Sequence, residues 1–238
     1  VGEAYQGVGM FAEAIKLYEK VKLVDSQKNY RDRVYLNLGK IHLESSNYDE
    51  ALLVGRTFLR NYPRSKSIPD AMLLLADAMK GKGDFTDALT AYKDLLVKSE
   101  DKARVHFLIG ETYRDMNRIA DAAQSYQKTI ETYDRQEKVI SEYLQKAYYR
   151  LGIALYNLNR FGPALEALKS ARELFPDNSL RDWADFLMIE SLEKLGDPSK
   201  VTEGLNRLVK TENTDDLTRQ AAESRAKIQE WEKQLKEG

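Results

Sequence analysis

Few residues of this chain could carry out acid–base or metal chemistry. Its 238 residues include only two histidines, His42 and His106, and neither lies near a pattern of acidic metal ligands. A metal centre or a general base needs such side chains to converge on one point. Each histidine falls at a packing position of an expected helix, so we interpret both as structural residues.

Two further patterns could be mistaken for functional sites. The pair Gly81 and Gly83 lacks the third glycine, the Gly-Lys-Ser/Thr ending and the preceding strand of a phosphate-binding loop. The acidic pair Asp49 and Glu50 stands at an expected helix start, where negative charge is stabilising without any catalytic role. The sequence has no cysteine, which excludes disulfides, thiol chemistry and thiolate zinc sites. It therefore predicts no enzyme, no cofactor and no metal site.

The overall charge argues against two kinds of partner. Lysine and arginine number 37 and aspartate and glutamate 38, which gives a net charge of −1. No global field therefore attracts nucleic acid or an anionic membrane. No run approaches the roughly 18 apolar residues of a membrane span, and the N-terminus lacks a charged region followed by an apolar core. We expect no nucleic-acid partner and no direct membrane insertion.

The chain is built around a unit that recurs along its length, and residues 146–176 form its most complete copy. This copy has the periodicity of two short amphipathic helices joined by a tight turn. Asn157 and Asn159 supply the turn chemistry, because their short amide side chains can bond the local backbone. Pro163 suits the first turn of the second helix, and Pro176 ends it.

Six copies can be aligned by two small-residue sites that stand twelve residues apart. The fixed offset is the strong evidence for a repeat, and successive first sites lie 34 to 42 residues apart. The first site holds Gly2, Gly39, Ala76, Gly110, Gly152 and, degraded, Ile189, and the second holds Ala14, Ala51, Ala88, Ala122, Ala164 and Val201.

This pattern resembles the tetratricopeptide repeat (TPR) family, whose usual period is about 34 residues. The resemblance implies an all-α fold, a right-handed TPR superhelix (an α-solenoid) of about six helix pairs with a C-terminal capping helix. A stacked array forms one continuous core, so we expect a single domain over residues 1–238. The expected repeats are about 1–26, 32–66, 69–100, 103–134, 137–177 and 180–211, and the capping helix is 215–236.

Two segments depart from the plain repeat. Residues 133–145 account for the longest spacing. We expect them to lengthen the first helix of the fifth copy, and the helix before it, instead of forming a loose loop. The last helix carries a narrow apolar seam that could cap the final repeat or make a coiled-coil contact with a partner. The seam consists of Leu217, Ala221, Ile228, Trp231 and Leu235.

In proteins of this family, the first helices of the repeats line a concave groove that binds extended peptides or partner helices. The resemblance places aromatic side chains beside mixed charges there, as a binding surface requires. The alternative interpretation is that Phe107, Tyr149 and Phe186 only fill space between the helices. The groove positions carried across are Arg33, Leu36, Lys40, Leu73, Asp77, Arg104, Phe107, Glu111, Lys146, Tyr149, Arg150, Ile153, Trp183 and Phe186.

One specialised groove of the family captures the acidic C-terminus of chaperones with a clamp of basic and amide residues. Lys146 and Arg150 match the last part of that clamp. Leu73, Asp77 and Leu108 stand where its remaining lysine and asparagines are expected. The clamp is incomplete, which puts a chaperone adaptor in doubt.

The favoured function is a non-catalytic scaffold that binds a peptide segment or helix of another protein in its groove. The Tyr62-Pro63 pair with the long linker after it resembles the repeats of bacterial envelope TPR proteins, which suggests envelope assembly. The alternative is a regulatory or targeting domain cut from a larger protein, whose remaining part could be an enzyme. A periplasmic and a cytoplasmic location both stay open.

The alignment also bears on the beginning of the chain. Val1 falls at the seventh position of a repeat, so the first part of that helix is missing. A shortened helix leaves apolar surface uncovered. We therefore expect a fragment of a longer array whose N-terminal edge can self-associate with another copy.

Overall fold

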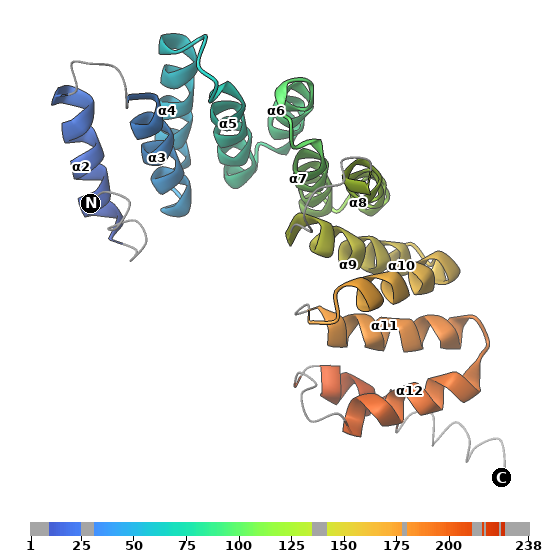
Figure 1. The fold of residues 1–238 in the computed structure, drawn as a ribbon. Coiled ribbons are helices and arrows are strands. Elements are labelled where there is room, and N and C mark those ends of the chain that lie inside the picture. Colours follow the sequence, from blue (N-terminus) through green and yellow to red (C-terminus); the bar gives the residue numbers. More distant parts are fainter. Residues whose placement is uncertain are drawn as a thin grey trace. The chain divides into compact units, whose positions relative to one another are not determined.

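The computed structural model describes residues 10–24, 31–134, 142–177, 180–210, 216, 218–223 and 225–226. Within these ranges the regular elements are all helices and none is a strand, which confirms the all-α prediction (Figure 1). The expected N-terminal edge falls on residues 1–9, outside the described part.

The helices follow one another in pairs separated by short turns. Each helix packs against the next within α2–α6 and within α8–α12, as the solenoid prediction requires. The elements are α2 (Phe11–Val24), α3 (Arg31–Glu44), α4 (Tyr48–Asn61), α5 (Ile68–Lys82), α6 (Phe85–Lys98), α7 (Lys102–Asp115), α8 (Ile119–Asp134), α9 (Glu142–Asn157), α10 (Phe161–Leu174), α11 (Arg181–Lys194) and α12 (Pro198–Lys210).

The chain divides into two compact units, which we describe separately. Unit 1 covers residues 1–112 and unit 2 covers residues 113–238. The single array over 1–238 and the handedness of its superhelix stay predictions.

One turn geometry recurs in both units. One or two residues after the end of α3, α5, α7, α9 and α11, a residue has a positive φ between 57° and 88°. This left-handed conformation lets the following amides bond back to the helix end, as when the Asn47 N–H donates to the His42 carbonyl at 2.8 Å. The left-handed conformation explains the glycines and asparagines at this site, but it does not explain Ser46. The residues are Ser46, Gly83, Asn117, Asn159 and Gly196.

Two helical glycines stand where a neighbouring helix approaches closely, and the first belongs to the repeat's first small-residue site. A Cβ added to Gly152 would lie 2.4 Å from the Leu168 Cδ2 atom and 3.3 Å from the Leu168 backbone nitrogen. The α9–α10 pair therefore meets backbone to backbone at this glycine. Gly55 is a second case, because a Cβ there would lie 2.8 Å from the Leu75 Cδ2 atom. Leu75 of α5 is the larger neighbour that this mid-helix glycine accommodates.

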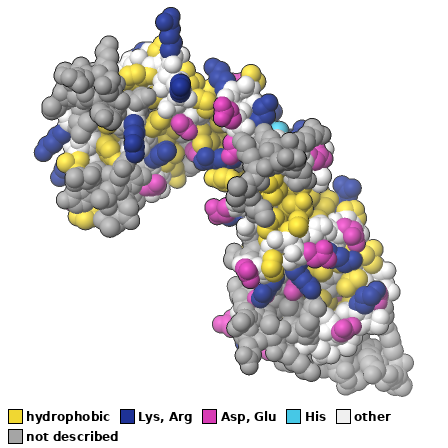
Figure 2. Space-filling view, in the orientation of Figure 1, with side chains coloured by type: hydrophobic (Ala, Val, Ile, Leu, Met, Phe, Trp, Pro, Cys, Tyr) yellow, Lys and Arg dark blue, Asp and Glu magenta, His cyan; other side chains and the backbone are white. Residues whose placement is uncertain are grey.

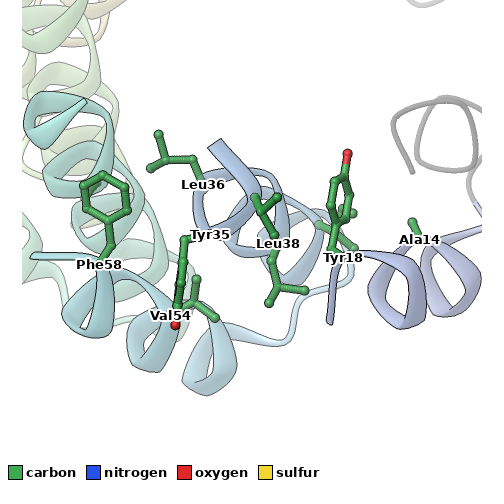
Figure 3. Packing of buried hydrophobic residues seen from close by; sticks show 10 residues of the cluster. Ala14, Tyr18, Tyr35, Leu36, Leu38, Val54 and Phe58 are labelled. Atoms are coloured by element: carbon green, nitrogen blue, oxygen red, sulfur yellow. The ribbon is translucent and has the colours of Figure 1, made fainter. Parts of the chain in front are cut away.

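The alanines of the second site are also enclosed, since Ala51, Ala88, Ala122 and Ala164 are each at most 1% exposed. In unit 1 the apolar faces of α2, α3 and α4 form one continuous cluster (Figure 3). Burial of such faces is the main source of stability in a stacked array. The cluster contains Ala14, Tyr18, Tyr35, Leu36, Leu38, Val54 and Phe58.

The long spacing between the fourth and fifth copies appears as longer helices. α8 and α9 each have 16 residues, against 14 in α7 and α10. Both described ends agree with the expectation, while residues 135–141 lie outside the description.

The described part of the last helix packs on α11 and α12. Ala222 is fully buried in a cluster with Ile189, Val201 and Leu205, and Ala226 packs against it. This arrangement fits the capping interpretation. Of the seam, Ala221 is half-buried, and Leu217, Ile228, Trp231 and Leu235 lie outside the described residues.

Candidate protein-binding face

The expected groove positions lie on the first helices of the pairs. α3 packs beside α5 in unit 1, and α9 packs beside α11 in unit 2, so neighbouring first helices share a face in each unit. We call the two sets the unit 1 face and the unit 2 face. The unit 1 face holds Arg33, Leu36, Lys40, Leu73, Asp77, Arg104, Phe107 and Glu111, and the unit 2 face holds Lys146, Tyr149, Arg150, Ile153, Trp183 and Phe186.

The side chains of the unit 1 face range from buried to exposed. Leu36 and Phe107 are 7% and 5% exposed, which leaves little of either side chain for a partner. Arg33 and Lys40 are exposed. The half-buried members between these extremes are Leu73, Asp77, Arg104 and Glu111.

Asp77 is tied to the second helix of its own pair. The hydroxyl of the fully buried Tyr92 donates a hydrogen bond of 2.5 Å to the Asp77 Oδ1 atom. Burial raises the pKa of the Asp77 carboxyl, and the Tyr92 bond and the charges of Arg104 and Lys80 oppose that rise. The carboxyl thus joins α5 to α6, and its charge is held where water is scarce.

Tyr149 occupies the corresponding interior of unit 2. It is 0% exposed, and its hydroxyl donates a 2.9 Å hydrogen bond to the Phe175 carbonyl. Burial, with the nearby charge of Asp185, raises the pKa of Tyr149 to about 12. The burial of Tyr149 and Phe107 fits the interpretation that these rings fill space between helices. As partner contacts they stay a prediction.

Trp183 behaves differently from the buried rings. Its side chain stacks on Phe186 with ring centroids 5.3 Å apart and an interplanar angle of 24°, and Trp183 stays 39% exposed. Among the described residues it is the one aromatic side chain with so large an exposed area. A rigid exposed aromatic residue held by a neighbour is a typical interface anchor.

Basic groups lie along α9 on the same face. Lys146 pairs with Glu142 one turn earlier on the helix. Arg150 and Ile153 line a narrow cavity of about 40 Å³ together with Arg114 and Asn157. Such a cavity holds roughly one water molecule. The accessible lining of the cavity is mostly apolar.

One contact of the unit 2 face was missed by the sequence reasoning. Arg225 from the last helix forms ion pairs with Glu190 and Glu193 of α11, the first with an Nε–Oε1 distance of 3.3 Å. The signal was present in the sequence: Ala222 follows Ile189 by 33 residues, close to one repeat period of about 34. The last helix therefore packs as the first helix of a further copy, and Arg225 covers the acidic end of the face.

The two histidines have half-buried positions on α3 and α7. Burial lowers the pKa of His42, against the opposing charges of Glu50 and Glu19. Across the described ranges no three metal-ligating side chains gather at one point. In the same ranges no helix is long and apolar enough to cross a membrane.

Comparison with family models identifies the fold. Tetratricopeptide repeat models match residues 2–66 and 70–137, and a further one matches residues 145–178. The chain therefore belongs to the tetratricopeptide repeat family, as its repeat pattern predicted. Membership supports a role as a protein-interaction scaffold, and members of the family are typically non-catalytic.

Solved structures share the fold. MamA of strain AMB-1 is 21% identical with a TM-score of 0.57, covering 75% of this chain and 90% of its own. MamA from Desulfovibrio magneticus RS-1 is 17% identical with a TM-score of 0.60, covering 78% and 97%. The apo form of RapI is 12% identical with a TM-score of 0.67, covering 87% and 61%. A search of curated proteins found no match.

Proposed function

We propose that this chain is a non-catalytic scaffold that holds a peptide segment or helix of another protein against the unit 2 face. The observation that carries the proposal is the exposed Trp183 stacked on Phe186. A tryptophan gives up much water-exposed area on binding and loses little conformational entropy, because Phe186 already fixes it. Hot spots of interfaces are accordingly enriched in tryptophan.

The neighbouring helix α9 supports the same role. Ile153 adds half-buried apolar surface to the unit 2 face, where it lines a small cavity together with Arg150. A segment that crosses from α11 to α9 can place one apolar side chain against the aromatic pair and another against Ile153. An aromatic core with a charged rim has the anatomy of a protein interface.

Substitution of the anchor tests the proposal. Partners captured by the parent chain from a lysate of its source organism would be identified, purified and titrated against Trp183→Ala. Loss of an anchor at an interface centre costs about 2 kcal/mol or more, or roughly 30-fold in affinity. Leu174→Ala is the matched control, because Leu174 is 54% exposed on α10, the second helix of its pair. If the two variants bind the partner equally well, the unit 2 face is not the site.

Fluorescence gives a second reading of the same contact. The sequence has two tryptophans, Trp183 and Trp231, so Trp231→Phe leaves Trp183 as the sole reporter. Burial by a bound partner should shift its emission to shorter wavelength. An unchanged spectrum at saturation would place the partner elsewhere.

The proposed setting is bacterial envelope assembly, which rests on the long repeats. The structure has a turn over residues 62–67 between α4 and α5, where the Tyr-Pro pair and the longer linker stand. The full-length gene separates this setting from the alternative. A signal peptide or a lipid-attachment cysteine would favour the envelope, and a fused catalytic domain would favour a regulatory or targeting role.

A further inference from the structure

A larger pocket lies inside unit 2, between α8 and the pair α9–α10. Its volume is about 490 Å³, and we call it the α8–α10 pocket. Ligand-binding clefts commonly measure about 300 to 1,000 Å³. Figure 2 shows hydrophobic side chains gathered over α9 and α10 on the visible side of the molecule. The pocket is therefore large enough for a big side chain of a partner.

The pocket has an apolar floor and a polar rim. Leu151 and Leu155 of α9 are 7% and 8% exposed and form the floor with Ala123 of α8. The rim side chains are exposed, which places polar groups at the mouth of the pocket. They are Gln124, Gln127, Lys128, Glu131 and Arg160.

The pocket and the unit 2 face use different sides of α9. Successive helical residues are about 100° apart, so Leu151, Leu155 and Leu158 share one side of the helix. Ile153 lies nearly opposite these leucines, and Arg150 lies about 100° around the helix from Leu151. A ligand in the α8–α10 pocket would thus leave the unit 2 face accessible.

The rim carries two cations and one carboxylate, which gives it a net charge of +1. Lys128 and Arg160 form no ion pair within the part of the chain that the structure describes. Several other cations of unit 2 do form ion pairs, as Arg118 does with Asp121 at 2.8 Å. The rim carboxylate of Glu131 accepts a hydrogen bond from Gln127 at 3.2 Å. Two cations beside an apolar floor favour a ligand that is apolar and acidic at once.

We propose that the α8–α10 pocket is a second docking site, which takes a large apolar side chain of a partner protein with a carboxylate beside it. The apolar side chain displaces water from the leucine floor. The neighbouring aspartate or glutamate pairs with Lys128 or Arg160. This site is independent of the unit 2 face, so the array can hold two segments at once.

A peptide selection tests the site. Random 12-residue peptides displayed on phage would be selected on the full chain and, in parallel, on Gln124→Trp. Gln124 is exposed, so the indole should cover the pocket without disturbing the fold. We expect peptides that bind only the parent, in which leucine, methionine or an aromatic residue stands next to aspartate or glutamate. Selection on Trp183→Ala should recover the same peptides.

Charge reversal tests the recognition of the carboxylate. An enriched synthetic peptide should lose about tenfold or more in affinity for the double variant Lys128→Glu with Arg160→Glu. Lys93→Glu with Lys98→Glu is the matched control, because it changes the net charge equally at exposed sites of α6. Its affinity should stay within about twofold of the parent.

Four outcomes would overturn the proposal. In the first, no selected peptide requires the open pocket. In the second, the peptides that require it are neutral or basic. In the third, the peptides no longer bind Trp183→Ala, which would assign them to the unit 2 face. Finally, the parent could self-associate in analytical ultracentrifugation while Gln124→Trp does not. In that case the occupant would be a second copy of this chain.

Discussion

The unit 1 face and the unit 2 face occupy the same register of the repeat and differ in what they leave exposed. The residue after the first small site is Asp77 in one copy and Ile153 in another. Asp77 accepts a hydrogen bond from Tyr92, whereas Ile153 lines a small cavity. Ile153 is on α9, which packs beside α11, the helix that carries Trp183. Register thus fixes where a side chain lies, and its own chemistry decides whether it serves the fold or a partner.

The largest expected effect tests whether both units pack at the same register. Ala88→Leu in unit 1 and Ala122→Leu in unit 2 each add three carbons at a site that is 0% or 1% exposed. Overpacking of this kind costs roughly 1 to 3 kcal/mol. Thermal unfolding followed by circular dichroism should show lower melting temperatures for both. Ala120→Leu, at an exposed site of α8, is the control. Unchanged melting of either buried variant would contradict the alignment of that copy.

A smaller effect tests the ion pairs at the end of the unit 2 face. Arg225→Met removes the cation that faces Glu190 and Glu193, whose side chains are 15% and 23% exposed. Because two partly buried carboxylates are left together, we expect a loss of about 1 to 2 kcal/mol by urea denaturation. Adding Glu193→Gln to Arg225→Met should restore part of the lost stability. A double variant no more stable than Arg225→Met would show that the carboxylates are not the cause.

The buried tyrosine of unit 2 gives the next effect. Tyr149→Phe removes the hydroxyl that donates to the Phe175 carbonyl, and a net hydrogen bond is worth about 1 kcal/mol. Tyr156→Phe on the same helix is the control, because its half-buried hydroxyl has no hydrogen-bond partner in the described part of the chain. Urea denaturation should separate the two variants. Equal stability would mean that water replaces the hydroxyl at no cost.

The sequence predicted the family, the helix pairs and the turn residues because these depend on local pattern. Positive φ at Asn159 and close approach at Gly152 follow from residue type and spacing. Exposure did not follow, since Phe186 and Tyr149 share a register but only Tyr149 is buried. The α8–α10 pocket depends on how three helices pack, which no local spacing determines. The repeat period places the helix of Arg225 beside α11, but the degraded residues of the last copy hide that register.

The smallest expected effect concerns the carboxyl that distinguishes the unit 1 face. Asp77→Asn keeps an oxygen that can accept from Tyr92 and removes a charge that burial disfavours. The pKa of Asp77 is raised in the folded chain, so the folded state binds a proton more readily than the unfolded state. The wild type therefore gains stability from this group as pH falls through the raised pKa toward 3.8, and this gain is absent above the raised value.

The free energy of unfolding of the variant, relative to that of the wild type, should consequently be highest at neutral pH. We expect Asp77→Asn to be equal to or more stable than the wild type at pH 7, by less than about 1 kcal/mol, because the lost attraction to Arg104 offsets part of the relief. The difference should shrink as the pH is lowered, in urea denaturation at several pH values. Asp94→Asn, at an exposed site of α6, is the control. A difference that grows in the variant's favour on acidification would show that burial does not dominate at Asp77.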